Sequence, residues 1–481
     1  MKNYSFKIVM LFFVLLVGFN SQAQAKKWTL QECVDYALKN NISIKQTELD
    51  AETTAITKKA AIGSFLPSIN ANASHSWNIG LNQNITTGLL ENQTTQFTSA
   101  GLNSNITIYN GLQNQNKLRK ANLSIIAAQY QLSKMQDDIS LNVANAYLQI
   151  LFNKENLKVQ NEQLANDEKQ QKKSEELVAA GVVARGDLLD VKATVAADRQ
   201  KVITAENNLF ISKLSLAQLL QIEDFQNFDT ADVDYEAKSS ATMLQKPEDI
   251  VEKAKQDRVE LKIAKANLQI AEKDVQIAKG AFQPSLTGFY SFNSRVSYAD
   301  RIVGFEPNVN NPTSVIGQVD GTGQNVLQPN YSAVLGKPLP FFDQFSRNKG
   351  HNFGVQLNIP ILNGFSAKNN VERFKIALER AKTNEKQAIL DLERNVYTAI
   401  TNAKVALNAY EAATAAFEAR KEAFNYAKEK YAVGMMNSFD FNQSQTLYVN
   451  AQSEVLRTKY DYIFKVKIVE FYFGIPIIEK K

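Results

Sequence analysis

The chain has 481 residues, of which 44% are hydrophobic and 21% charged, and its formal net charge is +5. A mean hydropathy of −0.28, with no apolar run near ~20 residues, excludes a protein built from several membrane-spanning helices. One cysteine excludes a disulfide framework and a cysteine-based metal cluster, and a nearly balanced charge without basic blocks gives no indication of nucleic-acid binding.

The N-terminus has the pattern of a cleaved export signal. Two lysines precede an apolar stretch over residues 8–19, and Ala23 and Ala25 are the small residues expected before a cleavage site. The alternative, a transmembrane anchor, needs ~20 residues, so this stretch is too short. We therefore predict that residues 1–25 are a signal peptide that is removed on export.

Beyond this signal, one pattern occurs twice. Three anchors recur in the same order: an octet ending just after a proline, an Asn-Gly pair, and a glycine six residues before an aspartate. They lie at 61–68 and 278–285, at 110–111 and 363–364, and at Gly181/Asp187 and Gly434/Asp440. The pattern predicts a first repeat over 26–221, a connector over 222–247, a second repeat over 248–475 and a tail over 476–481.

Each repeat begins with a helix and continues as two strands. A Thr-x-x-Glu capping box at Thr29 and Glu32 starts the first helix, which we expect to run without interruption to Pro67. Strict alternation of apolar residues with Asn and Ser then predicts half-buried strands. The strands are expected at about 68–82, 97–109, 285–298 and 352–361. The segment 299–351 holds five of the ten prolines and is expected to be a long surface loop.

The strands are followed by two very long helices. Residues 112–180 and 365–433 contain no proline and are rich in good helix formers. A helix of this length measures ~100 Å, which is typical of coiled coils and helical arrays. Each is expected to end in a tight tip, at 181–187 and 434–440, where glycine ends one helix and aspartate caps the next.

The polar and apolar faces of the predicted strands indicate two different surroundings, one aqueous and one apolar. One face carries aromatic and aliphatic residues, and Trp77, Tyr290, Phe292 and Tyr298 are typical of the aromatic girdle of a membrane barrel. Four strands cannot close a barrel, so a membrane location requires several copies of the chain. The alternative is a sheet that packs on a soluble partner.

At this point the sequence resembles the TolC-type outer-membrane efflux proteins over almost the whole exported chain. The matching features are the opening TLQECVDYALKNN, the prolines at the helix ends, the Asn-Gly helix starts, the glycine-to-aspartate tips and the two-fold repeat. The resemblance implies an α+β membrane channel: a homotrimer in which four strands per chain form one twelve-stranded barrel in outer-membrane lipid. The long helices continue this barrel as a coiled-coil tunnel across the periplasm, with the connector in a belt around it.

The resemblance also implies a function. The protein is expected to be the passive exit duct of a tripartite efflux or type I secretion system. Substrates arrive from an inner-membrane pump of the resistance-nodulation-division or ABC type through a periplasmic adaptor. No catalytic, cofactor or metal site is expected, since no nucleophile–base set or metal motif is present. A soluble periplasmic coiled-coil adaptor or scaffold is the alternative function.

Residue roles at the tips follow from the same resemblance. Asp440 matches a carboxylate that lines a cation-favouring constriction, although the second carboxylate of that ring is Gln443 here. Asp187 and Tyr431 match partners of a link that holds the tunnel shut, while the arginine of that link is Met436. Asp190 and Arg185 are candidates to replace it. The alternative is that the tip aspartates only cap their helices.

The remaining tip residues form the expected adaptor-docking surface. Exposed valine and methionine at a helical tip are unusual in a monomer and favour a partner helix. The residues are Gly181, Val182, Val183, Ala184, Arg185, Gly434, Met435, Met436, Asn437 and Ser438.

Overall fold

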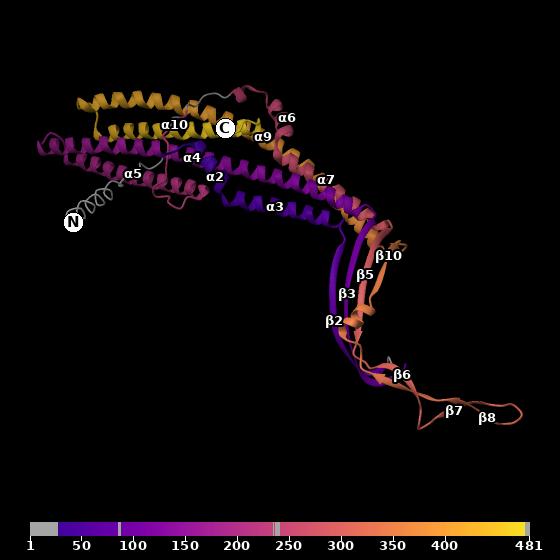
Figure 1. The fold of residues 1–481 in the computed structure, drawn as a ribbon. Helices are drawn as coiled ribbons and strands as arrows, with labels where there is room; N and C mark the ends of the chain where they lie inside the picture. Colours follow the sequence, from indigo (N-terminus) through magenta and orange to yellow (C-terminus); the bar gives the residue numbers. More distant parts are fainter. Residues whose placement is uncertain (1–26, 85–87, 234, 236–240, 477–481) are drawn as a thin grey trace, which may run out of the picture. The chain divides into compact units, whose positions relative to one another are not determined.

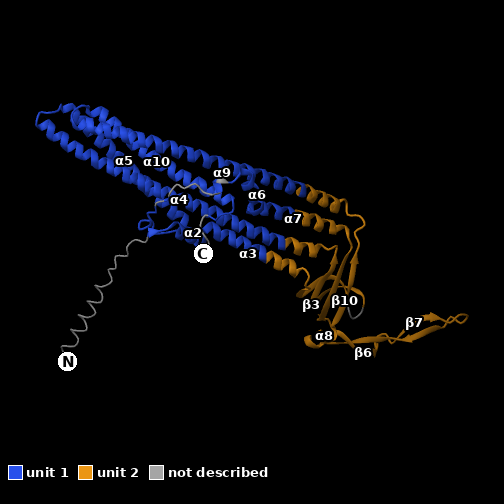
Figure 2. Cartoon of the chain, turned by 90° about the horizontal axis from the view of Figure 1, so that it is seen from above, with its two compact units in different colours: residues 1–55, 122–270, 378–481 blue, residues 56–121, 271–377 orange. Residues whose placement is uncertain are grey.

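A computed structural model describes residues 27–84, 88–233, 235 and 241–476. The expected signal peptide, part of the connector and nearly all of the tail lie outside the described residues. The chain divides into two compact units, shown in separate colours in Figure 2: residues 1–55, 122–270 and 378–481 form the first, and residues 56–121 and 271–377 form the second.

The second unit contains a four-stranded antiparallel sheet. Its strands are β2 (Ser68–Gln83), β3 (Leu90–Asn110), β5 (Ser285–Ser297) and β10 (Gly350–Asn358), in the order β10-β5-β3-β2 (Figure 1). β3 starts seven residues before the expected position because its first residues are almost all polar and give no alternation, yet they pair with β2 up to Gln83. β10 ends before Pro360, which has no N–H to donate to a neighbouring strand.

The alternation expected from the sequence is present across all four strands. Ala71, Leu102, Phe292 and His351 pair in one row on the apolar face. On the opposite face the Asn103 amide donates to Asn72 Oδ1 at 3.0 Å, and neighbouring rows are likewise Ser and Asn. The sheet therefore has one polar and one apolar face, and within the described residues β2 and β10 each pair on one side only.

The segment 299–351 is not an unstructured loop. It contains the nested hairpins β6 (Arg301–Pro307) with β9 (Tyr331–Gly336) and β7 (Thr313–Gln318) with β8 (Asn325–Pro329), followed by α8 (Phe341–Arg347). Short runs of β-branched residues form these strands, while the prolines and glycines lie mostly at their ends and turns. α8 packs on β5, where Ser294 donates a hydrogen bond to the Phe345 carbonyl at 2.7 Å.

Helices make up most of the remaining described residues. They are α2 (Leu30–Asn40), α3 (Ile42–Gly63), α4 (Gln113–Ala179), α5 (Arg185–Leu220), α6 (Pro247–Asp257), α7 (Val259–Lys279), α9 (Ser366–Ala432) and α10 (Ser438–Tyr472), with short 3₁₀ turns at Ala241–Leu244 and Gly280–Phe282. α4 and α9 each have 67 residues. No helix in the described part of the chain has an apolar stretch long enough to cross a membrane.

The first helix of each repeat is broken, contrary to the expectation of one helix up to Pro67. The capping box at Thr29 is present, but Asn41 is extended, with ψ of 127°. Its amide donates to the Leu219 carbonyl at 2.9 Å and its Oδ1 accepts from the Ser43 N–H, so it ends α2 and caps α3. Arg258 breaks the second repeat at the equivalent position, with ψ of 131° and its guanidinium 3.8 Å above the Phe471 ring.

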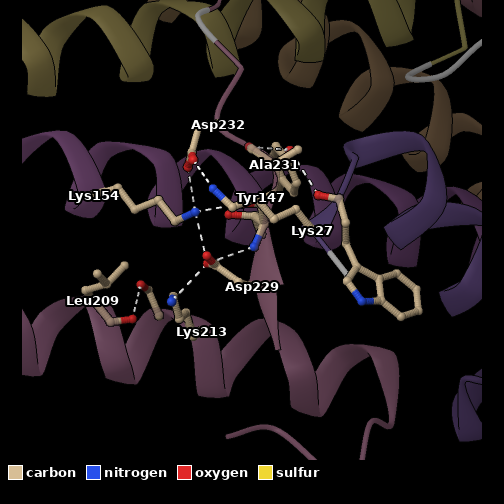
Figure 3. A network of polar contacts seen from close by, with 11 residues as sticks. Lys27, Tyr147, Lys154, Leu209, Lys213, Asp229, Ala231 and Asp232 are labelled. Carbon is tan, nitrogen blue, oxygen red and sulfur yellow. Dashed lines mark hydrogen bonds and ion pairs between the residues drawn. The ribbon is translucent and has the colours of Figure 1, made fainter. Parts of the chain in front are cut away.

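The core of the first unit encloses Tyr147, which is fully buried together with Cys33. The Tyr147 hydroxyl donates to the carbonyls of Trp28 and Ala231, so it joins the short strands β1 (Lys27–Trp28) and β4 (Asp229–Thr230) to α4 (Figure 3). This contact places the start of the described chain against the connector.

An ion-pair network surrounds the same strands. Asp229 Oδ1 lies 2.9 Å from the ammonium groups of both Lys154 on α4 and Lys213 on α5, and Asp232 accepts from Lys154 and Lys27 (Figure 3). Burial acts to raise the pKa of Asp229, but the hydrogen bonds from Lys213 and Lys154 outweigh it and hold that pKa below its usual value.

Asp229→Asn is expected to destabilise the first unit by about 2 kcal/mol at neutral pH, because it leaves two partly buried ammonium groups without their shared carboxylate. A depressed pKa contributes stability above the unfolded value of about 4 and loses it as the pH falls through the folded value. The difference from the wild type should therefore shrink in acid. Thermal unfolding as a function of pH measures this. Glu223→Gln, an exposed change in the same connector, is the control, and an equal loss with this control would contradict the role of Asp229.

Candidate functional site

The two tips have the same backbone geometry. Gly181 follows α4 with φ of +71°, and Gly434 follows α9 with φ of +78°. In each tip the next residue donates back to the last helical turn: Val182 N–H to the Leu177 carbonyl at 2.9 Å, and Met435 N–H to the Lys430 carbonyl at 2.8 Å. This is the Schellman ending, in which only glycine adopts the left-handed conformation without strain. The glycine-ended turns predicted from the sequence are confirmed.

The aspartates do not cap the helices. The N-cap residues are Ala184 and Asn437, and Asp187 and Asp440 lie at the third helical position, in the first turn. Asn437 Oδ1 accepts from the Asp440 N–H at 2.8 Å, while the Asn437 amide donates to the Asp440 carboxylate at 3.0 Å. The capping interpretation was therefore wrong. Both carboxylates lie in the first turn of their helix, near the positive end of its dipole.

Polar contacts connect the α4–α5 hairpin to the α9–α10 hairpin near the tips. Gln170 on α4 donates to the Tyr431 hydroxyl on α9 at 2.8 Å. Ser438 on α10 donates to Asp187 Oδ1 on α5 at a long 3.4 Å. Tyr431 also stacks on Phe441, with ring centroids 4.5 Å apart.

Asp187 and Tyr431 therefore each contact the other hairpin, but through different partners. No hydrogen bond joins them to each other in the part of the chain that the structure describes, and there Asp190 and Arg185 are exposed and form no ion pair. The expected link between them is replaced by two separate ones. Gln170 was not singled out from the sequence, because a glutamine inside a long helix carries no local signal.

The ends of the tips are apolar and exposed. Val182 is 68% exposed and Met435 77% exposed, and Leu189 and Phe439 beside them are also exposed. Val183 and Met436 are half-buried. Exposed apolar groups of this size on two neighbouring turns form a surface suited to contact with another protein.

The four aromatic residues predicted to form a girdle lie in two groups on the apolar face of the sheet. Trp77 and Tyr298 both contact His75, with ring centroids 4.3 and 5.6 Å apart. Tyr290 and Phe292 contact His351, and the Tyr290 hydroxyl lies 3.0 Å from His351 Nδ1. Both histidines thus belong to aromatic clusters. Among the described residues no group of three or more His, Cys, Asp or Glu is placed to hold a metal ion.

The sheet has one polar and one apolar face, and it is joined in sequence to very long helices with paired tips. This combination is that of the class of outer-membrane channels. Among solved structures, the Campylobacter jejuni CmeC outer membrane channel is similar, with a TM-score of 0.73 and 19% identity over 93% of this chain and 86% of that one. The Vibrio cholerae outer membrane protein VceC is also similar, with a TM-score of 0.71 and 13% identity over 92% of this chain and 96% of that one. The Neisseria gonorrhoeae MtrE outer membrane channel in its open state is similar as well, with a TM-score of 0.67 and 16% identity over 93% of this chain and 88% of that one.

The family model described as outer membrane efflux protein matches residues 33–220 and 250–466, and the chain belongs to this family. No curated protein sequence matches it. The chain is thus an efflux channel of the outer membrane with the TolC-like fold, as the resemblance predicted, and the family is one of channels that work in tripartite efflux assemblies and perform no catalysis. Family membership favours the channel over the soluble adaptor.

Proposed function

We propose that three copies of the chain form the exit duct of a tripartite efflux or type I secretion system. The observation that carries this proposal is the four-stranded sheet with one apolar face and two unpaired edges, because a bilayer tolerates strands only in a closed barrel. Three copies of four strands make twelve, within the range of known barrels, and residues 1–25 serve as the export signal.

The positions of the aromatic groups support this orientation. Tyr290 and Tyr298 lie eight residues apart along β5 and its continuation, which corresponds to about 27 Å along a strand and about 20 Å across a bilayer for a strand tilted by ~40°. Membrane barrels carry two aromatic girdles around an apolar band of about 25 Å. We therefore assign Trp77 and Tyr298 to one girdle, and Tyr290 and Phe292 to the other.

The tips are proposed to lie at the periplasmic end, where an adaptor docks and a pump delivers the substrate. Val182, Met435 and the other tip residues named above form the docking surface, and the two repeats, 26–221 and 248–475, each supply one tip. The connector over 222–247 holds the N-terminal segment against α4 and α5, in keeping with a belt around the helices.

Asp440 is proposed to make the duct cation-preferring, since symmetry-related carboxylates in a narrow throat repel anions. Asp440→Asn should then shift the reversal potential in a salt gradient toward zero, while Asp440→Glu, which keeps the charge, should not. Planar-bilayer recording of the purified protein measures both. An unchanged reversal potential in Asp440→Asn would remove Asp440 from the conduction path, and the absence of any channel current would contradict the duct itself.

A further inference from the structure

A pair of carboxyl groups is buried between α4 and α5, away from the tips. Asp167 and Asp198 are each 3% exposed. Asp167 lies twelve residues before the end of α4, which is about 18 Å along the helix. Burial within one chain can only increase when other copies pack around it, so this environment does not depend on the assembly.

The hydrogen bonds to this pair leave one carboxylate oxygen without a donor among the described residues. Gln163 on α4 and Gln445 on α10 each donate to one oxygen of Asp167 at 2.6 Å, and Lys201 donates to Asp198 Oδ1 at 2.9 Å. Asp198 Oδ2 is buried, and no donor from the described residues reaches it. The carboxyl groups of Asp167 and Asp198 nevertheless contact each other. Two ionised carboxylates are both acceptors, so this contact is a hydrogen bond only when one of them carries a proton.

We infer that Asp167 and Asp198 share one proton and that this proton fastens α4 to α5 within the first hairpin, at the place where Gln445 attaches α10, forming a pH-sensitive clasp. Burial raises the pKa of Asp167 to about 7, and the contact with Asp198 adds to this rise, while the amides of Gln445 and Gln163 oppose it. For Asp198 burial acts upward, but hydrogen bonds from Asp167 and Lys201 outweigh it and lower the pKa.

The charges around the clasp explain why loss of the proton weakens the contact between Asp167 and Asp198. α5 contributes Asp198 and Lys201, α4 contributes Asp167, and the group that α10 places there, Gln445, is neutral. Once Asp167 ionises, two buried carboxylates face a single ammonium group, and one of them lacks its hydrogen-bond donor. Two like charges so close together in a buried site repel strongly.

The direction of the pH effect follows from the raised pKa. A carboxyl group whose pKa is higher in the folded state contributes stability that is complete below its unfolded value of about 4 and is lost as the pH rises to about 7. The contact between α4 and α5 should therefore weaken across this range. The bond from the Gln445 amide to Asp167 should not weaken, because an ionised carboxylate is the stronger acceptor.

The repeat does not require this pair. α4 and α9 correspond with an offset of 253 residues, so the counterparts of Asp167 and Asp198 are Arg420 and Ala451. The carboxyl pair is therefore specific to the first hairpin and is not a demand of the hairpin geometry.

Infrared difference spectroscopy of the full-length protein in detergent tests the shared proton. Between about pH 5 and about pH 8.5 the wild type should lose the carbonyl band of a protonated carboxylic acid, with a midpoint near 7. Asp167→Asn and Asp198→Asn should both lack this change, and Glu168→Gln should keep it. Glu168 is the matched control because it lies next to Asp167, half-exposed, in an ion pair with Arg199 at 2.8 Å. A wild type without the band, or an unchanged band in Asp167→Asn, would overturn the inference.

Hydrogen exchange of α5 around Asp198 tests the clasp itself. After correction for intrinsic exchange, local opening should rise about tenfold per pH unit between about pH 5 and about pH 7 and then level off. In Asp167→Asn it should stay flat. Equal slopes in the two proteins would show that the proton does not join α4 to α5. Neither readout depends on channel activity, so failure of the exit-duct proposal would be recognised separately by the absence of current.

Discussion

Ala73→Arg is expected to abolish assembly of the protein in the outer membrane, whereas Ser74→Arg, one residue further along β2, is expected to leave assembly intact. Ala73 is exposed on the apolar face of the sheet, between Ala71 in the row of Phe292 and Trp77, and Ser74 lies on the polar face. Arginine on the lipid side of a barrel costs about 2–4 kcal/mol near the bilayer centre, while one on the inner side faces water.

In a trimer this cost applies to all three copies. The measurement is the amount of oligomer in isolated outer membranes, with the two variants expressed side by side. Both substitutions add the same charge to the same edge strand. A difference in the amount of oligomer therefore depends only on the face of the sheet that carries the arginine. Equal amounts of the two variants would mean that the apolar face does not meet lipid.

The double variant Tyr431→Phe with Ser438→Ala is expected to raise the ratio of open to closed channel about tenfold. Removing the 2.8 Å bond from Gln170 to Tyr431 costs about 1 kcal/mol, and the 3.4 Å bond from Ser438 to Asp187 contributes less. Together they amount to about 1.4 kcal/mol, which is a factor of ten. Single-channel recording gives the ratio directly.

Tyr426→Phe is the matched control for this variant. Tyr426 is an exposed tyrosine on the same helix as Tyr431, and among the described residues its hydroxyl makes no bond to the other hairpin. An increase in opening with Tyr426→Phe as large as with the double variant would show that the tip does not depend on these two links.

Alternation and helix-forming composition were sufficient to predict the main elements. The two faces of the sheet follow from side chains that alternate every second residue, and the long helices follow from proline-free segments of good helix formers. The two glycine-ended tips were also predictable, because a glycine at the end of a helical pattern has a specific backbone role.

The helix breaks were not predictable, since an asparagine or arginine within a helical pattern is ordinary. Asn41 ends its helix because its side-chain amide donates a hydrogen bond to the distant Leu219 carbonyl. Arg258 ends its helix because its guanidinium group lies over the ring of the distant Phe471. The partners of the site residues could not be predicted for the same reason: Gln170 and Tyr431 are 261 residues apart in sequence, and Asp167 and Gln445 are 278 apart. Contacts of this kind depend on how the hairpins pack, which no local pattern contains.

The mass of protein in the detergent-solubilised particle is the most direct test of the trimeric duct. The chain alone has four long strands, an apolar sheet face and two unpaired sheet edges within its described residues, so we expect a particle with three chains, about three times the mass of one. A particle with a single chain, in a detergent that keeps the protein folded, would contradict it, because the apolar face and both edges would then have to be covered in some other way.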